Sequence, residues 1–269
     1  QETYPVHERV VLVVTASRDV SVYEEAYAEC YVIENELEYV GFANDFGPYN
    51  LASTYSFCQR LEQFLSSTPE GDISVICMDD SKSIANAVFL LGAYLIMMKD
   101  FDLEGTYPIF KDLLPKAQGF CDVSRGNPQF LLAVQDCWEG LHQAKTLGWV
   151  SFTADDDTHF DYESYLQLDN PLNADLHVVV PDKFIAMRGP KDIGDNAFLD
   201  TNHPDGTFRC RDFSPAYIAD ILCQYDVKAV IRLNEPFYDA ASFQSEGIAV
   251  ADLFFDDCTP PSALVVAKF

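Results

Sequence analysis

The sequence predicts an α/β fold built from two tandem domains. Short apolar runs rich in β-branched residues alternate with polar loops and helices, an order typical of a sheet whose strands are joined by helices. Val10–Val14 is the first such run, and Ile73–Cys77 is followed at once by a polar loop and an apolar helix. A second set of strands and helices begins near Leu176. We therefore expect a central sheet flanked by helices in each domain, with the second domain incomplete at Phe269.

The first domain is predicted over residues 1–126. A continuous β-branched run such as Val10–Val14 suits a strand that is buried on both faces. The most apolar run, 85–98, is shorter than a bilayer span and contains Asn86, so it is predicted to be a buried core helix. The other predicted elements are strands at Tyr31–Ile33, Leu37–Val40 and Ile73–Cys77, and a helix that follows a turn within Asp45–Leu51 and runs to about Leu65.

A long helix is predicted as a linker over residues 127–150. Pro128 suits its first turn, and Gly148 ends it after about Leu147. The helical period separates an apolar face from a polar face. The apolar face carries Leu131, Val134, Trp138 and Leu141, and the polar face carries Asp136, Glu139 and Gln143.

The second domain is predicted over residues 151–269. It opens with an acidic stretch, 153–161, whose change of composition marks a domain junction. Ser214 as N-cap and Pro215 at the first helical position predict a helix. Residues 191–212 are predicted to be a loop. The predicted strands are two short ones within Leu176–Arg188, then Val227–Leu233 and Ile248–Phe255, and a further helix begins at Ala263.

The net charge separates classes of partner. The chain has 43 Asp and Glu residues against 17 Lys and Arg, a formal net charge of −26. A surface this negative disfavours nucleic acid and membranes as partners and favours cationic ones. The alternative is that the acidity only serves solubility. With 48% hydrophobic and 22% charged residues, the composition is that of a globular protein.

The eight cysteines indicate neither a metal site nor a disulfide framework. They are scattered, with no C-x-x-C pair, and the aspartates of 155–161 do not match a calcium-binding loop. We expect no metal, no cofactor and reduced thiols in an intracellular protein. No signal-peptide pattern opens the chain, and Gln1 indicates that the numbered chain begins inside a longer one.

The stretch Asp252–Pro261 holds the candidate catalytic residue. An apolar strand runs into a loop with two adjacent carboxylates, Asp256 and Asp257, before a Pro-Pro pair and a helix. A carboxylic acid on a loop can protonate a leaving group if a nucleophile lies opposite it. None of the eight residues after Pro261 is such a nucleophile. In the alternative interpretation, the two carboxylates cap the helix that begins near Pro261.

Several segments, taken in order, resemble the cell-division-cycle-fourteen family of dual-specificity protein phosphatases. They cover nearly the whole chain, and their order makes the set specific. The segments are Asn44–Pro48 with Asn50–Ala52, Ala85–Ala87 with Leu91–Tyr94, Asp136–Cys137, Val180–Pro181, Phe184–Ala186 with Gly189–Pro190, Val230–Asn234 and Asp252–Phe255.

The resemblance implies two tandem phosphatase-like domains, of which the first lacks catalytic machinery and helps to bind the substrate. It implies hydrolysis of phosphoserine, phosphothreonine and phosphotyrosine, with a preference for phosphoserine followed by proline and, downstream, a basic residue. Such enzymes oppose cyclin-dependent kinases during cell division, in the nucleus and cytoplasm and at the centrosome or basal body. Aligned on Asp252–Phe255, the general acid of the family falls on Asp257.

Five carboxylates are candidates for binding the basic residue of a substrate. They lie on the predicted linker helix and just after it, where they would line an acidic groove for Lys or Arg. The alternative is that they form a solvated helix face and loop. The five are Asp136, Glu139, Asp155, Asp156 and Asp157.

The sequence departs from the family at the catalytic loop. Such phosphatases need a thiolate and, after five intervening residues, an Arg that binds the phosphate oxygens. No cysteine of the chain has an Arg at that spacing. In the family this loop follows a helix equivalent to the one at Ala263, so we expect the chain to be truncated before it. Two smaller departures are Cys258, where the family usually has Gly, and Val178, where it often has Trp.

A second loop, Cys77–Ser83, occupies the place of a phosphate-binding loop in the first domain. Asp79 and Asp80 would repel a phosphate dianion there, so this site is expected to be degenerate. Two functions therefore stay open. The chain is either the substrate-binding domain and leading catalytic part of a phosphatase, inactive by itself, or a non-catalytic module that binds basic or phosphorylated proteins.

Overall fold

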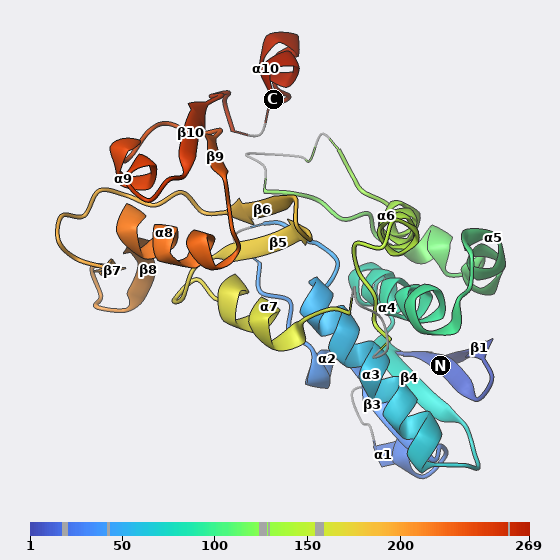
Figure 1. Ribbon diagram of the computed structural model, residues 1–269. Coiled ribbons are helices and arrows are strands. Elements are labelled where there is room, and N and C mark those ends of the chain that lie inside the picture. The colour runs from blue at the N-terminus through green and yellow to red at the C-terminus, as the bar shows by residue number, and fades with distance from the viewer. Residues whose placement is uncertain (18–20, 42–43, 124–127, 129, 154–158, 258) are drawn as a thin grey trace. The chain divides into compact units, whose positions relative to one another are not determined.

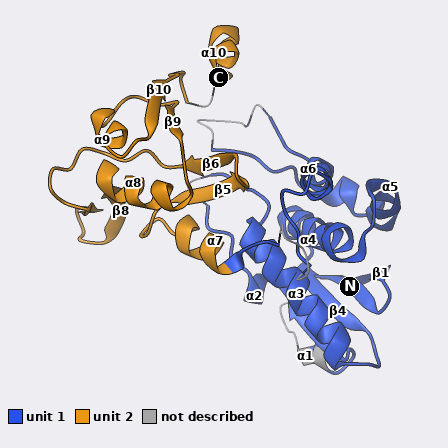
Figure 2. Ribbon diagram, viewed as in Figure 1, with its two compact units in different colours: residues 1–162 blue, residues 163–269 orange. Residues whose placement is uncertain are grey.

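The computed structural model describes residues 1–17, 21–41, 44–123, 128, 130–153, 159–257 and 259–269. They form two compact units, Gln1–Tyr162 (unit 1) and Glu163–Phe269 (unit 2), as Figure 2 shows. Both units contain strands and helices, which confirms the predicted α/β class (Figure 1). The division falls after Tyr162, whereas the change in composition predicted it after residue 150.

Unit 1 is built on a four-stranded sheet. Its strands are β1 (Glu2–His7), β2 (Val10–Thr15), β3 (Glu29–Val32) and β4 (Ile73–Met78), in the order β1-β2-β4-β3. β4 pairs in parallel with β2 and β3, while β1 pairs antiparallel with β2. Every residue of β2 is buried, as its continuous β-branched run predicts. The predicted strands at 10–14, 31–33 and 73–77 are therefore confirmed.

The helices of unit 1 cover this sheet. α3 begins where Asn50 accepts a hydrogen bond from the Ser53 amide, and it follows the predicted turn. Phe57 of α3 packs edge-on against Tyr31 of β3. The helices are α1 (Ser21–Glu24), α2 (Ile33–Glu36), α3 (Leu51–Ser67), α4 (Ser81–Lys99), α5 (Leu103–Thr106), α6 (Val134–Thr146) and the 3₁₀ turns η1 (Tyr107–Phe110) and η2 (Leu114–Lys116).

α4 is the central helix of unit 1. By length and composition it could cross a membrane, yet 78% of its most apolar window is buried inside the unit. Every residue from Ile84 to Met97 is buried, which confirms the predicted core helix. α6 packs on it through Trp138, whose Nε1 donates to the Phe89 carbonyl at 3.1 Å. A Cβ at Gly92 would lie 2.1 Å from the Trp138 ring, so only glycine leaves room for this contact.

The predicted helix 127–147 is wrong at its start, because α6 begins at Val134. Leu132 instead exchanges two backbone hydrogen bonds with Phe120 in an isolated antiparallel bridge, so it is not part of the helix. The helix then starts where the Asp136 carboxylate accepts a hydrogen bond from the Ala133 amide at 2.7 Å. α6 belongs to unit 1.

A second prediction in unit 1 is also wrong. Residues 37–40 form no strand. The chain turns at α2 instead, where the Leu37 amide donates to the Ile33 carbonyl at 2.9 Å. The Tyr39 hydroxyl then donates to Asp45 at 2.7 Å and holds the segment against a loop rather than a sheet.

Unit 2 contains three strand pairs around one apolar core. β5 (Leu176–Val180) and β6 (Phe184–Met187) form a hairpin, as do β7 (Phe198–Asn202) and β8 (Phe208–Phe213), while β9 (Ala229–Arg232) and β10 (Ala249–Asp252) pair in parallel. The helices are α7 (Tyr162–Asp169), α8 (Pro215–Gln224), α9 (Ala241–Gln244) and α10 (Ala263–Lys268). The core residues include Leu176, Phe213, Ile218, Leu222, Val230, Phe243 and Ile248.

Most predicted elements of unit 2 are present, with one correction. The strands within 176–188 and near 230 and 250 are confirmed, and Ser214 caps α8 by accepting from the Tyr217 amide. Residues 191–212 are not a plain loop, because they contain the β7–β8 hairpin. Asp200 and Arg211 face each other across it and form an ion pair, which stabilises the two strands.

Candidate functional site

The loop between β4 and α4 has the topology of a phosphate-binding loop. β4 ends at Met78 and α4 begins at Ser81, so the backbone N–H groups at the helix start point toward the end of a parallel strand. Asp80 is the N-cap of α4, and its carboxylate accepts hydrogen bonds from the Lys82 and Ser83 amides, both at 3.0 Å. A carboxylate of the chain therefore occupies the position that an anion would take.

The same loop suppresses the reactivity of its cysteine. Cys77 is fully buried, and burial raises the pKa of its thiol well above the ordinary value. The carboxylates of Glu34, Asp80 and Asp79 raise the thiol pKa further. Glu34 also accepts the Met78 amide at 3.0 Å. A catalytic thiolate needs a lowered thiol pKa and an empty anion site. Here the thiol pKa of Cys77 is raised, and the carboxylate of Asp80 fills the anion site.

The loop after β10 carries the predicted general acid. Its first residues stay attached to β9, because the Leu253 amide donates to the Arg232 carbonyl at 2.9 Å and the Phe255 amide to the Leu233 carbonyl at 3.2 Å. Beyond this anchor, both Asp256 and Asp257 are exposed. A carboxyl group at the carboxyl edge of a parallel strand pair, open to solvent, is accessible to a substrate.

α10 tests the alternative in which the two aspartates cap a helix. The N-cap is Ser262, whose hydroxyl accepts the Val265 amide at 3.3 Å. The capping interpretation of Asp256 and Asp257 is therefore wrong. Cys258, which stands where the family usually has Gly, lies outside the described residues.

Arg232 forms an ion pair beside this loop that the sequence did not predict. It is 7% exposed, and its guanidinium forms a bidentate ion pair with Asp252, with Nε–Oδ1 at 2.5 Å and Nη2–Oδ2 at 2.9 Å. Nη1 donates to the Tyr238 carbonyl at 2.7 Å. These hydrogen bonds hold the pKa of Asp252 below its ordinary value, so Asp252 stays ionised and cannot serve as a proton donor. An arginine at the end of an otherwise apolar strand was the available signal.

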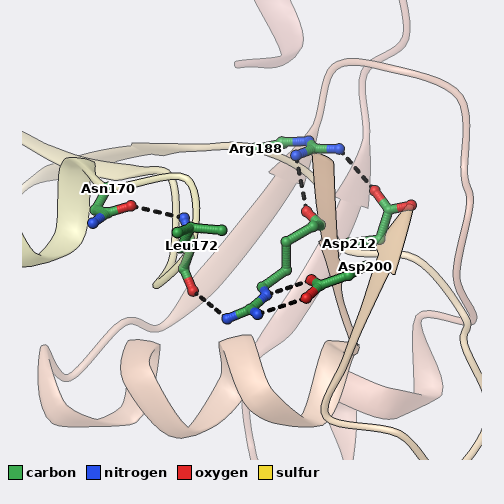
Figure 3. Close-up of polar contacts among 6 residues, drawn as sticks. Asn170, Leu172, Arg188, Asp200 and Asp212 are labelled. Atoms are coloured by element: carbon green, nitrogen blue, oxygen red, sulfur yellow. Dashed lines mark hydrogen bonds and ion pairs between the residues drawn. The ribbon is translucent and has the colours of Figure 1, made fainter. Parts of the chain in front are cut away.

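A second ion-pair network lies on the β7–β8 hairpin (Figure 3). Arg211 binds Asp200 through Nε at 2.6 Å and Nη2 at 2.8 Å, and also donates to the Leu172 carbonyl at 2.9 Å. Arg188 donates to Asp212 at 2.7 Å and to the Arg211 carbonyl at 3.0 Å. This network joins the hairpin to the segments that follow α7 and β6, so its geometry indicates a structural role.

The candidate groove residues that the structure describes both have partners in unit 1. Asp136 accepts the Ala133 amide at the start of α6, and Glu139 accepts the Tyr107 hydroxyl at 2.9 Å. Burial, followed by this hydrogen bond, raises the pKa of Tyr107 to about 12. Asp155, Asp156 and Asp157 lie outside the described residues. That the five carboxylates line a groove for Lys or Arg stays a prediction. Among the residues described, no group of three or more His, Cys, Asp or Glu could hold a metal ion.

Comparison with known protein families identifies the chain. A family model described as "Dual specificity protein phosphatase, N-terminal half" matches residues 5–144, more than half of the chain. The most similar curated relatives carry CDC14 names. The chain belongs to the CDC14 family of dual-specificity protein phosphatases.

Three CDC14 relatives illustrate the extent of the match. Tyrosine-protein phosphatase cdc-14 of Caenorhabditis elegans is 30% identical over 249 residues, 89% of this chain and 33% of the relative. Human CDC14C is 31% identical over 245 residues, 89% of this chain and 51% of the relative. Human CDC14A is 31% identical over 243 residues, 89% of this chain and 38% of the relative. The chain thus spans about a third to a half of the relatives it matches.

Proposed function

We propose that this chain is part of a protein phosphatase in which unit 2 supplies the general acid, Asp257, and unit 1 binds the substrate. The observation that carries the proposal is the loop after β10. Its first residues are hydrogen-bonded to β9, and the next two carboxylates are exposed at the carboxyl edge of the strand pair. Membership of the CDC14 family supports phosphate monoesters of proteins as the substrate class.

The proposed reaction proceeds through a cysteinyl-phosphate intermediate. A thiolate sulfur forms a bond to phosphorus as the bond from phosphorus to the substrate oxygen breaks, and Asp257 gives its proton to that departing oxygen. Water then attacks phosphorus, regenerates the thiolate and releases phosphate, while Asp257 takes a proton from the water. An alkoxide is a poor leaving group, so the proton is needed most for phosphoserine and phosphothreonine.

The proposed substrate is a phosphoserine or phosphothreonine followed by proline and, downstream, a basic residue, with phosphotyrosine also accepted. A net charge of −26 favours cationic segments in partner proteins. Asp136, Glu139 and Asp155–Asp157 are the proposed groove residues. By the same family resemblance, the protein would oppose cyclin-dependent kinases in dividing cells, in the nucleus and cytoplasm and at the centrosome or basal body.

The decisive experiment uses the complete product of the gene that encodes this chain. Hydrolysis is measured for a phosphoserine-proline-lysine peptide and for an aryl phosphate whose phenol is acidic. Asp257→Asn should lower kcat for the peptide by roughly 10²–10⁴-fold, the usual contribution of a general acid. It should affect the aryl phosphate far less, because that leaving group needs no proton.

Asp256→Asn is the matched control, since the neighbouring carboxylate is also exposed. It should leave both rates within a few-fold of the unaltered protein. Equal losses on both substrates for Asp257→Asn, or the selective loss appearing in Asp256→Asn, would refute Asp257 as the general acid.

A second candidate function is a non-catalytic module for basic or phosphorylated proteins. It is favoured by one observation, that no cysteine of this chain is followed by Arg at the catalytic spacing. This function predicts that the complete gene product binds the same peptide, measured by fluorescence anisotropy, without hydrolysing either substrate. Hydrolysis above background by that product would exclude it.

A further inference from the structure

Arg232 and Asp252 stand at equivalent ends of two parallel strands. Each is the last residue of its strand, β9 and β10, and the two are register partners. The carboxyl edge of a parallel sheet is where the loops that carry function begin. The ion pair therefore joins the two strands at the point where the chain leaves β10 for the loop that bears Asp257.

The arginine is fixed from several directions. Besides the two hydrogen bonds to Asp252, its Nη1 donates to the Tyr238 carbonyl at 2.7 Å. The guanidinium carbon also lies 4.9 Å from the centre of the Tyr238 ring, a distance suited to a cation–π contact. At 7% exposure the side chain has little room to adopt another rotamer. Its position, and hence that of Asp252, is determined by the core of unit 2.

Holding the strands together does not explain a buried charge here. Arg232 is buried, whereas the Asp252 side chain is 62% exposed, so water screens the attraction while the cost of burying the arginine charge remains, and the pair contributes little net stability. Two apolar residues could join β9 to β10 as well. What the bidentate pair adds is a defined direction for the backbone at Asp252, because both carboxylate oxygens are bound. The next amides, of Leu253 and Phe255, then bond to β9.

We propose that Arg232 and Asp252 are positioning residues that fix the start of the loop carrying Asp257. The inference rests on the proposed function of Asp257. Neither residue touches the phosphate or donates the proton; the pair sets where the carboxyl group of Asp257 stands relative to the leaving oxygen. Displacing a catalytic group by about 1 Å can lower a rate by roughly 10²-fold, so such a device has a measurable effect.

The activity test again uses the complete gene product with two substrates, the phosphoserine peptide and the aryl phosphate, whose leaving groups differ in acidity. Asp252→Asn removes the charge but leaves Arg232 buried without its partner, so the variant is at risk of misfolding. The double variant Arg232→Met with Asp252→Leu removes both charges and avoids an unpaired buried ion. It should lower hydrolysis of the phosphoserine peptide by roughly 10–100-fold relative to hydrolysis of the aryl phosphate.

Two further variants make the test specific. Arg232→Lys keeps one hydrogen bond to Asp252. Its rate of peptide hydrolysis should therefore lie between that of the double variant and that of the unaltered protein. Asp200→Asn breaks the ion pair with Arg211, which has a similar bidentate geometry on the β7–β8 hairpin of the same unit. It should leave the ratio of the two rates unchanged, because that pair does not adjoin the Asp257 loop.

A second measurement does not depend on activity. Hydrogen exchange at the Leu253 and Phe255 amides should be at least tenfold faster in the double variant than in the unaltered chain, and unchanged in Asp200→Asn. Unchanged exchange, or an equal loss on both substrates, would overturn the positioning role. If Asp257→Asn affects both substrates equally, or if the complete gene product hydrolyses neither, the proposed function of Asp257 is refuted. The exchange rates of the Leu253 and Phe255 amides then decide by themselves whether the Arg232–Asp252 pair anchors the loop.

Discussion

Each unit places carboxylates just after a parallel strand, and the two units use them differently. After β4, Asp80 turns back onto the Lys82 and Ser83 amides of its own helix. At the end of β10, Asp252 binds Arg232 although its side chain is 62% exposed, and Asp256 and Asp257 in the loop that follows are exposed as well. The residue type and the topology are alike in the two loops. Asp80 fills its loop by bonding to the amides of its own helix, whereas Asp256 and Asp257 are exposed.

The helix caps account for much of this difference. α4 is capped by Asp80, the residue directly before it, which uses that carboxylate and blocks the anion position. α10 is capped by Ser262, so its amides do not need the aspartates that precede it. The residue that caps the helix therefore differs between the two loops. It is an aspartate of the loop itself for α4 and a serine for α10, where Asp256 and Asp257 are exposed.

The largest expected difference between the loops is catalytic. In the complete gene product, Asp79→Asn should leave the hydrolysis of a phosphoserine peptide within a few-fold, whereas Asp257→Asn should lower it by roughly 10²–10⁴-fold. Initial rates at saturating peptide measure both. A comparable loss in Asp79→Asn would mean that the loop of unit 1 takes part in the reaction and would break the comparison.

Thiol reactivity should separate Cys77 from an exposed cysteine. Cys77 is fully buried and its pKa is raised by burial, whereas Cys223 is exposed on unit 2. Because the thiolate is the reactive form, iodoacetamide at mildly alkaline pH should label Cys223 and leave Cys77 unmodified until the chain is unfolded. Mass spectrometry of peptides from the native and urea-treated protein measures this. Early labelling of Cys77 would show that the loop opens.

The cap itself should contribute a modest stability to unit 1. Asp80→Ala removes the acceptor for two amides at the start of α4 and should lower the free energy of unfolding by about 1 kcal/mol. Urea denaturation followed by circular dichroism measures the change. Asp257→Ala serves as the comparison and should lower the free energy of unfolding less than Asp80→Ala does, because the N-cap of α10 is Ser262. Equal losses in the two variants would contradict the assignment of different roles.

The smallest expected effect concerns acid stability. Arg232 holds the pKa of Asp252 below 3.8, so the ion pair stabilises the folded state above this value. The contribution is lost as the pH falls through 3.8 toward the lower pKa of the folded state. The stability gap between the unaltered chain and Asp252→Asn should therefore narrow in urea titrations below pH 3.8. A gap that stays constant would assign the effect to packing rather than charge.

The sequence allowed prediction of the elements whose signals are local. A β-branched run predicted β2, and a serine before a proline predicted the start of α8, because both signals act within a few residues. The start of α6 was misplaced, since the hydrogen bonds between Leu132 and Phe120 that delay it come from a distant segment. The β7–β8 hairpin was missed for a similar reason, because its charged strand residues pair with each other across the turn.

The candidate site was predictable only in part. Asp257 could be proposed from a family motif, and the aspartates of the Cys77–Ser83 loop from their charge. The partnership of Arg232 with Asp252 could not be derived, because it joins residues twenty positions apart that meet only when β9 and β10 pair. The role of Asp80 was missed although its signal is local, because an aspartate directly before an apolar helix is a preferred N-cap residue.

The contact between Trp138 and Gly92 makes the core of unit 1 observable by fluorescence. The chain has two tryptophans, of which Trp138 is fully buried and Trp149 is 38% exposed. Iodide should quench the emission of Trp149 and spare that of Trp138, so the unquenched, blue-shifted fraction reports the packing of α6 on α4. Each substitution described above, made in this chain, can then be checked for an intact unit 1 in the cuvette without labels.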